Sequence, residues 1–373
     1  MSSLAPSRAI ISLSAYAHNL GIVKEMIPNS CRILAVVKAD AYGHGAVQIA
    51  RAAVSQGASM LGVATVSEGV ELREAGIETP ILVMVQITDD QIGAVIEHGL
   101  RLTISDADTA ERVGDQARRA NKVVPVHCKV DTGMGRQGFW LDTAAAEMLF
   151  LTRISNIDIE AICTHFPVAD SSREPFTSNQ VRALKQLLKQ LEKEGIPYNI
   201  VHAANSSAVV NHPNSVFDMV RPGLMTYGVW PTDSPPAVSP LRPVLRWETR
   251  VVLVKRLDAG ASIGYGRTYT TRDRARVGVL PVGYADGYKY GLSNRADVLI
   301  RGKRCPVRGT ISMDQTVVDL SEVPEAALGD TAILIGADGN DAITAAELAV
   351  HAQTIPYDIL TGIGRRVTRE YVE

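Results

Sequence analysis

The stretch CRILAVVKADAYGHG, residues 31–45, places a lysine directly after a short apolar run. Residues 33–37 are all apolar, rich in β-branched side chains and too few for a helix, so they predict a strand buried on both faces. Lys38 then leaves apolar surroundings, and desolvation lowers the pKa of a lysine and frees its amine to act as a nucleophile or base. Tyr42 adds a hydroxyl donor, and the two glycines after it let the backbone approach a ligand closely. The structural alternative is a solvated lysine that caps a core strand.

A regular alternation of strands and helices extends outward from this stretch. A helical pattern over 12–28 precedes it, and further helix-compatible segments lie between most of the apolar runs, at 46–57, 67–75, 106–120, 142–151 and 178–194. The apolar runs lie at 31–37, 60–65, 80–85, 100–104, 123–130, 157–163, 198–202 and 216–220. Eight such runs favour a parallel α/β sheet closed into a (β/α)8 barrel. An open doubly wound sheet is the alternative.

Polar residues follow these runs in the way that a barrel requires, because functional side chains of such barrels lie just after the strands. They are Lys38, Lys129, Arg136, His165, Asn205, Ser206 and Arg221. The loops after the seventh and eighth strands commonly hold phosphate. Here these loops carry a hydroxyl at Ser206 and a glycine at Gly223, which suit an anion.

The composition changes at the proline-rich segment 231–243, which indicates a linker or domain edge. Beyond it, runs rich in valine and isoleucine are separated by short turns, which is typical of a mainly β domain. We therefore expect a barrel domain over 1–238 and a mainly β domain over 239–373.

Composition excludes several classes of partner. The net charge of −2 gives no electrostatic case for nucleic acid or an anionic membrane, and no apolar stretch reaches the roughly 20 residues of a membrane span. The first residues lack the pattern of a secretory signal, and the four cysteines and eight histidines lack metal-ligand spacing. We expect a cytoplasmic protein without a metal site.

The segment 133–138 matches the pattern G-x-G-x-x-G of dinucleotide sites. Asp131 and Thr132 separate its first glycine from the strand, and no acidic strand end is clearly placed about twenty residues on, so the context of that motif is missing. We interpret the segment as a glycine-rich loop that positions Arg136.

Nine motifs in order resemble the alanine racemase family, across nearly the whole chain and both predicted domains. They are AVVKADAYGHG (35–45), KVDTGMGR (129–136), THF (164–166), HAANS (202–206), RPGLMTYG (221–228), GYGRTYT (264–270), GYADG (283–287), SMDQ (312–315) and PYDIL (356–360).

The resemblance implies pyridoxal 5'-phosphate as cofactor, held on Lys38 as a Schiff base. Arg221 would face the pyridine nitrogen and Arg136 the phenolic oxygen of the ring, with Lys129 carbamylated to hold Arg136. The remaining cofactor-binding residues that it implies, mostly around the phosphate, are Tyr42, His165, Asn205, Ser206, Gly223, Leu224 and Tyr357.

The resemblance also implies racemisation of alanine by two bases, Lys38 and Tyr265, with His165 tuning the tyrosine. In water, lysine and tyrosine both have pKa values near 10, so the pKa of each base needs lowering. Arg136, Met313 and Tyr284 would bind the substrate. In the family, a homodimer shares its sites, so Tyr265 and Met313 would act in the partner's barrel. The enzyme would supply D-alanine for peptidoglycan or consume it.

Two departures from the family pattern concern substrate entry. Arginines that line the entry corridor of relatives are absent near Lys289 and at Thr310. A racemase of broader substrate specificity therefore remains an alternative. A basic amino-acid decarboxylase of the same fold is disfavoured, since it would place a carboxylate where Arg221 stands. A non-catalytic pyridoxal-phosphate carrier would be a single barrel, and the predicted second domain argues against that alternative.

Overall fold

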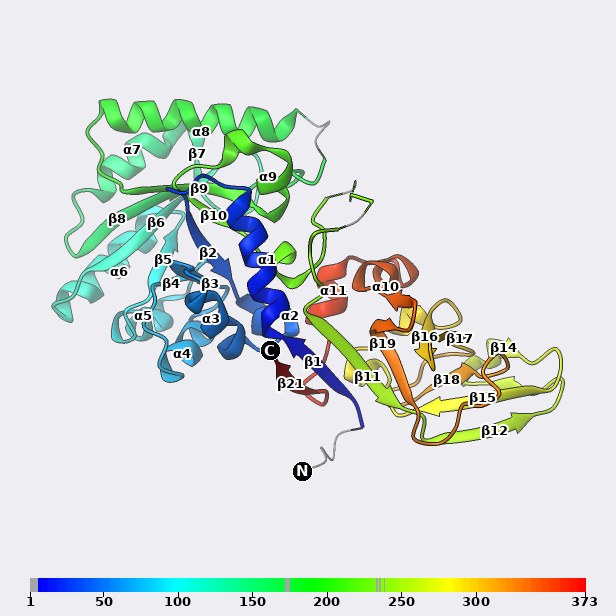
Figure 1. Cartoon of the computed structure of the whole chain (residues 1–373). Helices are drawn as coiled ribbons and strands as arrows, with labels where there is room; N and C mark the ends of the chain where they lie inside the picture. The colour runs from blue at the N-terminus through cyan, green and yellow to red at the C-terminus, as the bar shows by residue number, and fades with distance from the viewer. Residues whose placement is uncertain (1–5, 172–174, 233, 235, 238) are drawn as a thin grey trace. The chain divides into compact units, whose positions relative to one another are not determined.

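A computed structural model describes residues 6–171, 175–232, 234, 236–237 and 239–373. The chain forms two compact units. The barrel unit comprises Tyr16–Ala41 and Ala46–Leu241. The β unit comprises Arg242–Glu373 together with Tyr42–Gly45 and the described residues before Tyr16. Figure 1 labels their elements.

Eight parallel strands close the barrel, because β5 pairs with β6 and β10 pairs with β2. The open-sheet alternative is therefore wrong, and each predicted run overlaps one of the strands. These are β2 (Arg32–Val36), β3 (Met60–Val63), β4 (Ile81–Val83), β5 (Arg101–Ile104), β6 (Val124–Asp131), β8 (Ile157–Cys163), β9 (Ile200–Asn205) and β10 (Met219–Arg221). The short β7 (Phe139–Trp140) pairs with β6 outside this ring. The strands are buried along most of their length, as their continuous apolar character predicts.

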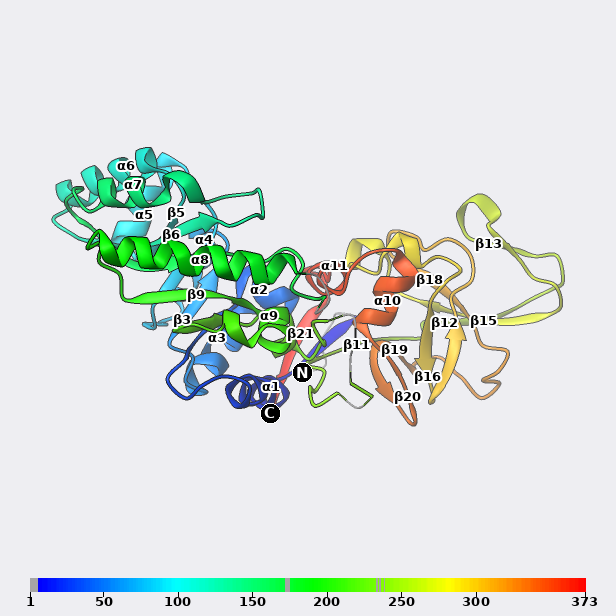
Figure 2. The same ribbon diagram turned by 90° about the horizontal axis from the view of Figure 1, so that it is seen from above.

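Helices alternate with these strands and flank them, as Figures 1 and 2 show for α6, α7 and α8. The five helices predicted between strands are confirmed within a few residues. Thr65 and Glu68 form a capping box at the start of α4, and Asp106 caps α6. The helices of this part of the chain are α1 (Leu13–Glu25), α2 (Lys38–Gly43), α3 (Ala46–Ser55), α4 (Val66–Glu74), α5 (Ile92–Glu97), α6 (Ala107–Arg119), α7 (Leu141–Leu151), α8 (Phe176–Lys193) and α9 (Ser206–Asn211).

The β unit contains a larger sheet ordered β17-β16-β19-β11-β1-β21, with β20 paired to β19, and a smaller sheet ordered β12-β15-β18. The strands are β1 (Arg8–Ser12), β11 (Leu245–Arg250), β12 (Leu253–Leu257), β13 (Ser262–Ile263), β14 (Tyr269–Thr270), β15 (Ala275–Leu280), β16 (Asp297–Ile300), β17 (Lys303–Pro306), β18 (Thr316–Asp319), β19 (Thr331–Asp338), β20 (Asp341–Ile343) and β21 (Thr368–Val372). Two helices lie between β20 and β21 in the chain, α10 (Ala345–Ala352) and α11 (Pro356–Thr361). A mainly β second domain is thus confirmed.

The first strand, β1, was not predicted. It lies between β11 and β21, strands that are more than 230 residues away in the sequence, so local pattern does not reveal its pairing. The described residues before Tyr16 therefore pack in the β unit, and the limits 1–238 and 239–373 remain a prediction.

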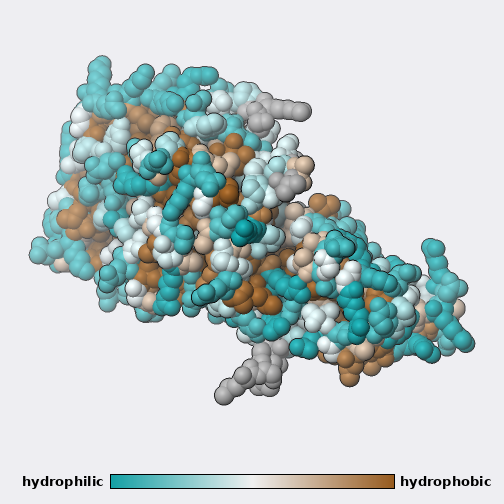
Figure 3. All heavy atoms as spheres, viewed as in Figure 1, coloured by the Kyte–Doolittle hydropathy of each residue, from teal (hydrophilic) through white to brown (hydrophobic). Residues whose placement is uncertain are grey.

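The surface in Figure 3 is mostly hydrophilic, with apolar side chains showing between the polar ones. Among the described residues, no helix combines the length and the apolar character that crossing a bilayer requires.

Candidate active site

Lys38 begins α2 one residue after the fully buried end of the β2 run, and its side chain is half-buried. Burial lowers the pKa of its amine, and the cations Arg136 and Arg221 lower it further against an opposing effect of Glu68. The predicted nucleophile is therefore a lysine that loses its proton more readily than a lysine in water.

The turn after Lys38 is left-handed. Ala39, Asp40, Ala41 and Tyr42 have φ values of 53°, 52°, 52° and 55°. This conformation costs an L-residue about 1–2 kcal/mol. The Glu68 carboxylate accepts a 2.6 Å hydrogen bond from the Ala39 N–H, and Asp40 accepts one of 2.7 Å from the Ala46 N–H. These bonds hold a strained turn next to the reactive lysine.

Gly43 and Gly45 make room for the protein itself, whereas the sequence suggested room for a ligand. A Cβ on Gly43 would lie 2.3 Å from the Leu360 carbonyl oxygen, and one on Gly45 would lie 1.8 Å from the Tyr371 hydroxyl. The ring of Tyr42 lies 5.8 Å from that of Tyr357, centroid to centroid. Two of the predicted phosphate ligands are therefore neighbours.

Arg221 ends β10, and five hydrogen bonds fix its terminal nitrogens. Nη1 donates to Nδ1 and to the carbonyl oxygen of His202, at 2.7 and 2.8 Å. Nη2 donates to the carbonyl oxygens of Thr164 and Ala203 at 2.7 and 3.0 Å, and to Nδ1 of His165 at 3.2 Å. Nε donates to no other residue that the structure describes. The Nε–H is thus the one donor of this arginine without an acceptor among the described residues.

The contact with Arg221 decides the protonation of His165. An arginine only donates, so Nδ1 of His165 accepts and a neutral ring carries its proton on Nε2. Burial, and then the cations Arg221, Lys129 and Arg136, lower the pKa of His165 well below its usual value. His165 is therefore a neutral imidazole whose Nε2–H has no acceptor among the residues that the structure describes.

Lys129 lies near the end of β6, where burial is the main cause that lowers the pKa of its amine to about 8. Arg221 and Arg136 act in the same direction, against the nearby Cys163 thiol. An amine of this pKa is partly neutral at neutral pH.

Asp131 holds the glycine-rich loop that carries Arg136. Its carboxylate accepts hydrogen bonds from the N–H groups of Gly133, Met134 and Arg136 at 2.8, 2.8 and 3.1 Å. Although burial opposes it, these bonds hold the pKa of Asp131 below its usual value. The expectation that this loop positions Arg136 agrees with this geometry, and Asp131 is a residue that the sequence analysis missed.

The loops after β9 and β10 meet at Ser206, whose Oγ accepts a 2.8 Å hydrogen bond from the Gly223 N–H. Leu224 follows directly, at the start of a short 3₁₀ helix. Asn205 has a structural role, since its Oδ1 caps α9 by accepting from the Ala208 N–H at 3.0 Å. Ser206, Gly223 and Leu224 thus form one cluster, as the sequence predicts.

Of the three residues of the β unit predicted to act as base or to bind substrate, the structure brings Tyr284 and Met313 together. Tyr284 donates its N–H to the Ser312 carbonyl at 3.1 Å, and Ala285 donates to that of Met313 at 3.0 Å, so these segments run side by side. Within the described chain, the Met313 N–H donates to no residue. The side chain of Tyr265 stands on a neighbouring loop and is strongly exposed, at 76%.

Thr310, one of the two departures, supports Tyr265. Its hydroxyl donates a 2.8 Å hydrogen bond to the Tyr265 carbonyl oxygen and lies 3.0 Å from the Thr268 hydroxyl. The second departure, Lys289, forms a 3.0 Å ion pair with Asp358 on α11. Both positions thus stabilise elements that carry predicted site residues, Tyr265 and Tyr357.

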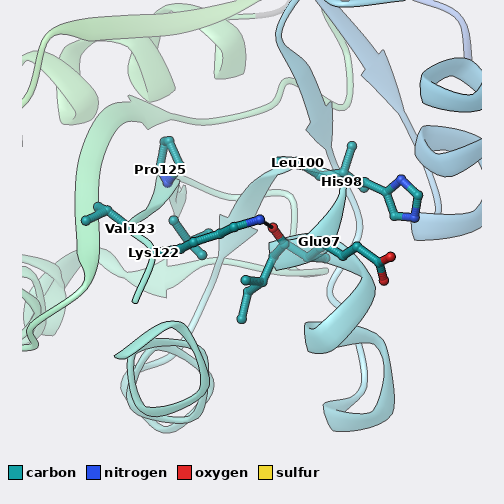
Figure 4. Close-up of a pocket in the computed structure, with 10 residues that line it drawn as sticks. Glu97, His98, Leu100, Lys122, Val123 and Pro125 are labelled. Carbon is teal, nitrogen blue, oxygen red and sulfur yellow. Dashed lines mark hydrogen bonds between the residues drawn. The ribbon is translucent and has the colours of Figure 1, made fainter. Parts of the chain in front are cut away.

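A pocket of about 250 Å³ lies apart from these residues (Figure 4). It is lined by residues 95–100, which precede β5, and by residues 122–125, which lead into β6 and include its first two residues, so it lies at the amino ends of these strands. The Lys122 amine donates to the Ile96 carbonyl there at 3.0 Å. None of the predicted site residues lines it.

Comparison with known proteins gives consistent matches over both units. The family profile "Alanine racemase, N-terminal domain" matches residues 11–231, and "Alanine racemase, C-terminal domain" matches 244–371. The chain is 44% identical to alanine racemase of Symbiobacterium thermophilum, covering 100% of this chain and 98% of the relative.

Solved structures agree with this match. Alanine racemase of Clostridium difficile 630 superposes with a TM-score of 0.95 at 34% identity, covering 99% of this chain and 96% of that one. That of Bartonella henselae, solved with covalently bound pyridoxal phosphate, gives 0.89 at 29% identity and covers 99% and 100%.

Proposed function

The chain belongs to the alanine racemase family, a family of amino-acid isomerases, and on that premise we propose that it interconverts L-alanine and D-alanine with pyridoxal 5'-phosphate. One observation carries this proposal: Lys38, with its lowered pKa, and Arg221 follow or end the neighbouring strands β2 and β10. Among the described residues, the Nε–H of Arg221 is its one donor without an acceptor.

The residues present fit the cofactor. Lys38 would hold it through its amine, and the Arg221 Nε–H would donate to an unprotonated ring nitrogen. Tyr42, Tyr357, Ser206, Gly223 and Leu224 would hold the phosphate, with Asn205 shaping that loop. When bound, the cofactor withdraws electrons from the α-carbon of the attached amino acid. A donor that keeps its own proton limits that withdrawal, which disfavours transamination.

Two opposed bases would move the α-proton, the Lys38 amine on one face and the Tyr265 phenol on the other. The Nε2–H of neutral His165 would donate to the Tyr265 oxygen and favour its ionised form. Met313 would bind the substrate carboxylate through its available N–H, beside Tyr284 and together with Arg136.

We propose a homodimer in which Tyr265 and Met313 of the partner subunit complete each barrel site. The exposure of both side chains in the β unit, 76% and 52%, supports a role toward a second copy. Lys129 would carry a carbamate, since its pKa of about 8 leaves a reactive neutral fraction and the negative product would attract Arg136.

The cellular role would be supply of D-alanine for peptidoglycan, or its consumption, in the cytoplasm. A racemase of broader specificity is the second candidate, because Thr310 and Lys289 replace the arginines of the family pattern and are bound within the β unit.

Purified protein with pyridoxal phosphate in D2O tests the proposal. Starting from L-alanine or D-alanine, optical rotation should decay to zero while the α-proton signal disappears from the NMR spectrum. A panel of other L-amino acids measures specificity. Exchange of the α-proton without loss of optical rotation would contradict racemase activity.

A further inference from the structure

A chain of hydrogen bonds crosses the inside of the barrel, beyond the residues that the proposed function uses. His202 Nε2 lies 2.8 Å from His127 Nδ1, and His127 Nε2 lies 2.9 Å from Glu160 Oε2. Glu160 in turn accepts two hydrogen bonds from Arg101, at 2.7 and 3.1 Å. The chain begins at Arg221, at the carboxyl end of β10, and ends at Arg101, the first residue of β5.

The two histidines of this chain are buried, with exposures of 0% and 1%. Burial is the main cause that lowers the pKa of both, so both rings are neutral at neutral pH. The charged groups around them are Glu160, Arg101, Arg221, Lys129 and Arg32.

The donor at one end of this series of hydrogen bonds and the acceptor at the other fix the direction of donation. Arg221 donates to His202 Nδ1, so the proton of His202 is on Nε2 and points to His127 Nδ1. The proton of His127 is then on Nε2 and is donated to Glu160. Burial raises the pKa of Glu160, but the bonds from His127 and Arg101 outweigh it and lower that pKa to about 2. A carboxylate that is ionised at neutral pH thus accepts the last of three successive donations.

We propose that Glu160 is a positioning residue that acts on Arg221 through His127 and His202, fixing the tautomers of both rings and offsetting part of the arginine's positive charge. Hydrogen bonds in a chain polarise one another, so the anion makes His202 a better acceptor for Nη1. The role of Glu160 toward the cofactor rests on the proposed function, whereas the tautomers assigned to His127 and His202 do not depend on it.

The first test reads the tautomers directly. In the full chain with ¹⁵N-labelled histidine, NMR should show His127 and His202 protonated on Nε2 only, from pH 6 to 9. A proton on Nδ1 of either ring would contradict the proposed direction of these hydrogen bonds, whether or not the protein binds pyridoxal phosphate.

The second test measures the charge at the site. The pH titration of the visible absorbance of the cofactor-loaded enzyme would report protonation of the Lys38 nitrogen that bonds the cofactor, and the charged neighbours of Lys38 are Arg136, Glu68, Arg221 and Lys129. Glu160→Gln removes the anion and makes Arg221 more cationic, so the midpoint should move to lower pH by about half a unit. Arg101→Gln removes a cation from the same end, so its midpoint should move to higher pH.

Two further variants serve as references. Glu160→Asp keeps the charge and should return the midpoint toward wild type. Asp330→Asn removes a carboxylate from a similar two-bond pair with Arg301, at 2.6 and 3.0 Å in the β unit, and should leave the midpoint unchanged. If Glu160→Gln and Arg101→Gln both bind the cofactor and racemise alanine with unchanged midpoints, the hydrogen bonds from Arg221 to Glu160 have only a structural role. A wild-type protein that binds no cofactor would instead contradict the proposed function.

Discussion

Arg221 would combine stability and chemistry in one residue. Its four terminal N–H groups satisfy buried carbonyl oxygens and imidazole nitrogens, so within the described residues only the Nε–H lacks an acceptor, and its direction is fixed. Arg221→Lys keeps a positive charge but loses that planar fork.

We expect Arg221→Lys to lower the free energy of unfolding by roughly 1–3 kcal/mol, because buried carbonyl oxygens lose their donors. Racemisation should fall at least 100-fold, on the order expected when a fixed catalytic group is lost. Arg73→Lys is the control, since Arg73 also donates to several backbone carbonyl oxygens of the barrel unit, outside the site. Urea denaturation and kcat should show that both variants lose stability and that only Arg221→Lys loses activity. Equal activity losses would mean that Arg221 acts only through stability.

Lys38 gives a pH prediction. Because its pKa is lowered, the neutral amine forms at lower pH than in a free lysine, so modification should rise with pH through a midpoint below the usual lysine value. Borohydride reduction of the pyridoxal-phosphate-treated protein, followed by peptide mapping across pH, should place the adduct on Lys38. An adduct on Lys129 would contradict the assignment.

At the scale of elements, the left-handed α2 is the feature least expected from its sequence. Ala39, Asp40 and Ala41 are residue types that ordinarily adopt right-handed conformations, yet all have positive φ. Glycine adopts this conformation without the steric penalty, although it also makes the unfolded chain more flexible.

We therefore expect Ala39→Gly to raise the free energy of unfolding by about 0.5 kcal/mol. Ala146→Gly is the matched control, an exposed alanine inside the right-handed α7, and it should lower that free energy by about 1 kcal/mol. Chemical denaturation measures both. Equal losses in the two variants would show that the turn stores no strain.

The loop that carries Tyr265 gives another prediction at this scale. Thr310→Val removes the hydroxyl that binds the Tyr265 carbonyl while keeping the side-chain volume. We expect kcat for L-alanine to fall about 10-fold, a cost of about 1.4 kcal/mol typical of one positioning hydrogen bond. Thr152→Val, which removes a 2.7 Å bond to the Leu149 carbonyl at the end of α7, should not change kcat. An unchanged kcat in Thr310→Val would rule out this support.

The elements also show what the sequence could predict. The eight barrel strands were predictable because continuous burial makes each one a local apolar run. The strand β1 was not, since its partners are distant in the sequence. Lys38 and Arg221 could be placed at strand ends, but Glu68, Thr310 and Glu160 act on groups 29 or more residues away, which local pattern does not reveal.

At the scale of the whole molecule, Glu160 links stability to pH. Its pKa is about 2 in the folded chain and higher when unfolded, so its contribution is full above the unfolded value and is lost as pH falls toward 2. Wild-type stability should therefore drop between about pH 5 and pH 2 by roughly 2–3 kcal/mol more than that of Glu160→Gln. Urea denaturation at each pH measures this difference, and parallel curves for the two proteins would contradict it.

The central claim concerns two copies of the chain, a barrel with Lys38 and a β unit with Tyr265 from its partner. The direct measurement mixes inactive Lys38→Ala chains with inactive Tyr265→Ala chains, verifies mixed dimers by mass spectrometry, and assays racemisation. If sites are shared, each mixed dimer contains one intact site, and a random mixture should recover about a quarter of wild-type activity, because about half of its dimers are mixed. No recovery in verified mixed dimers would show that each chain builds its site alone.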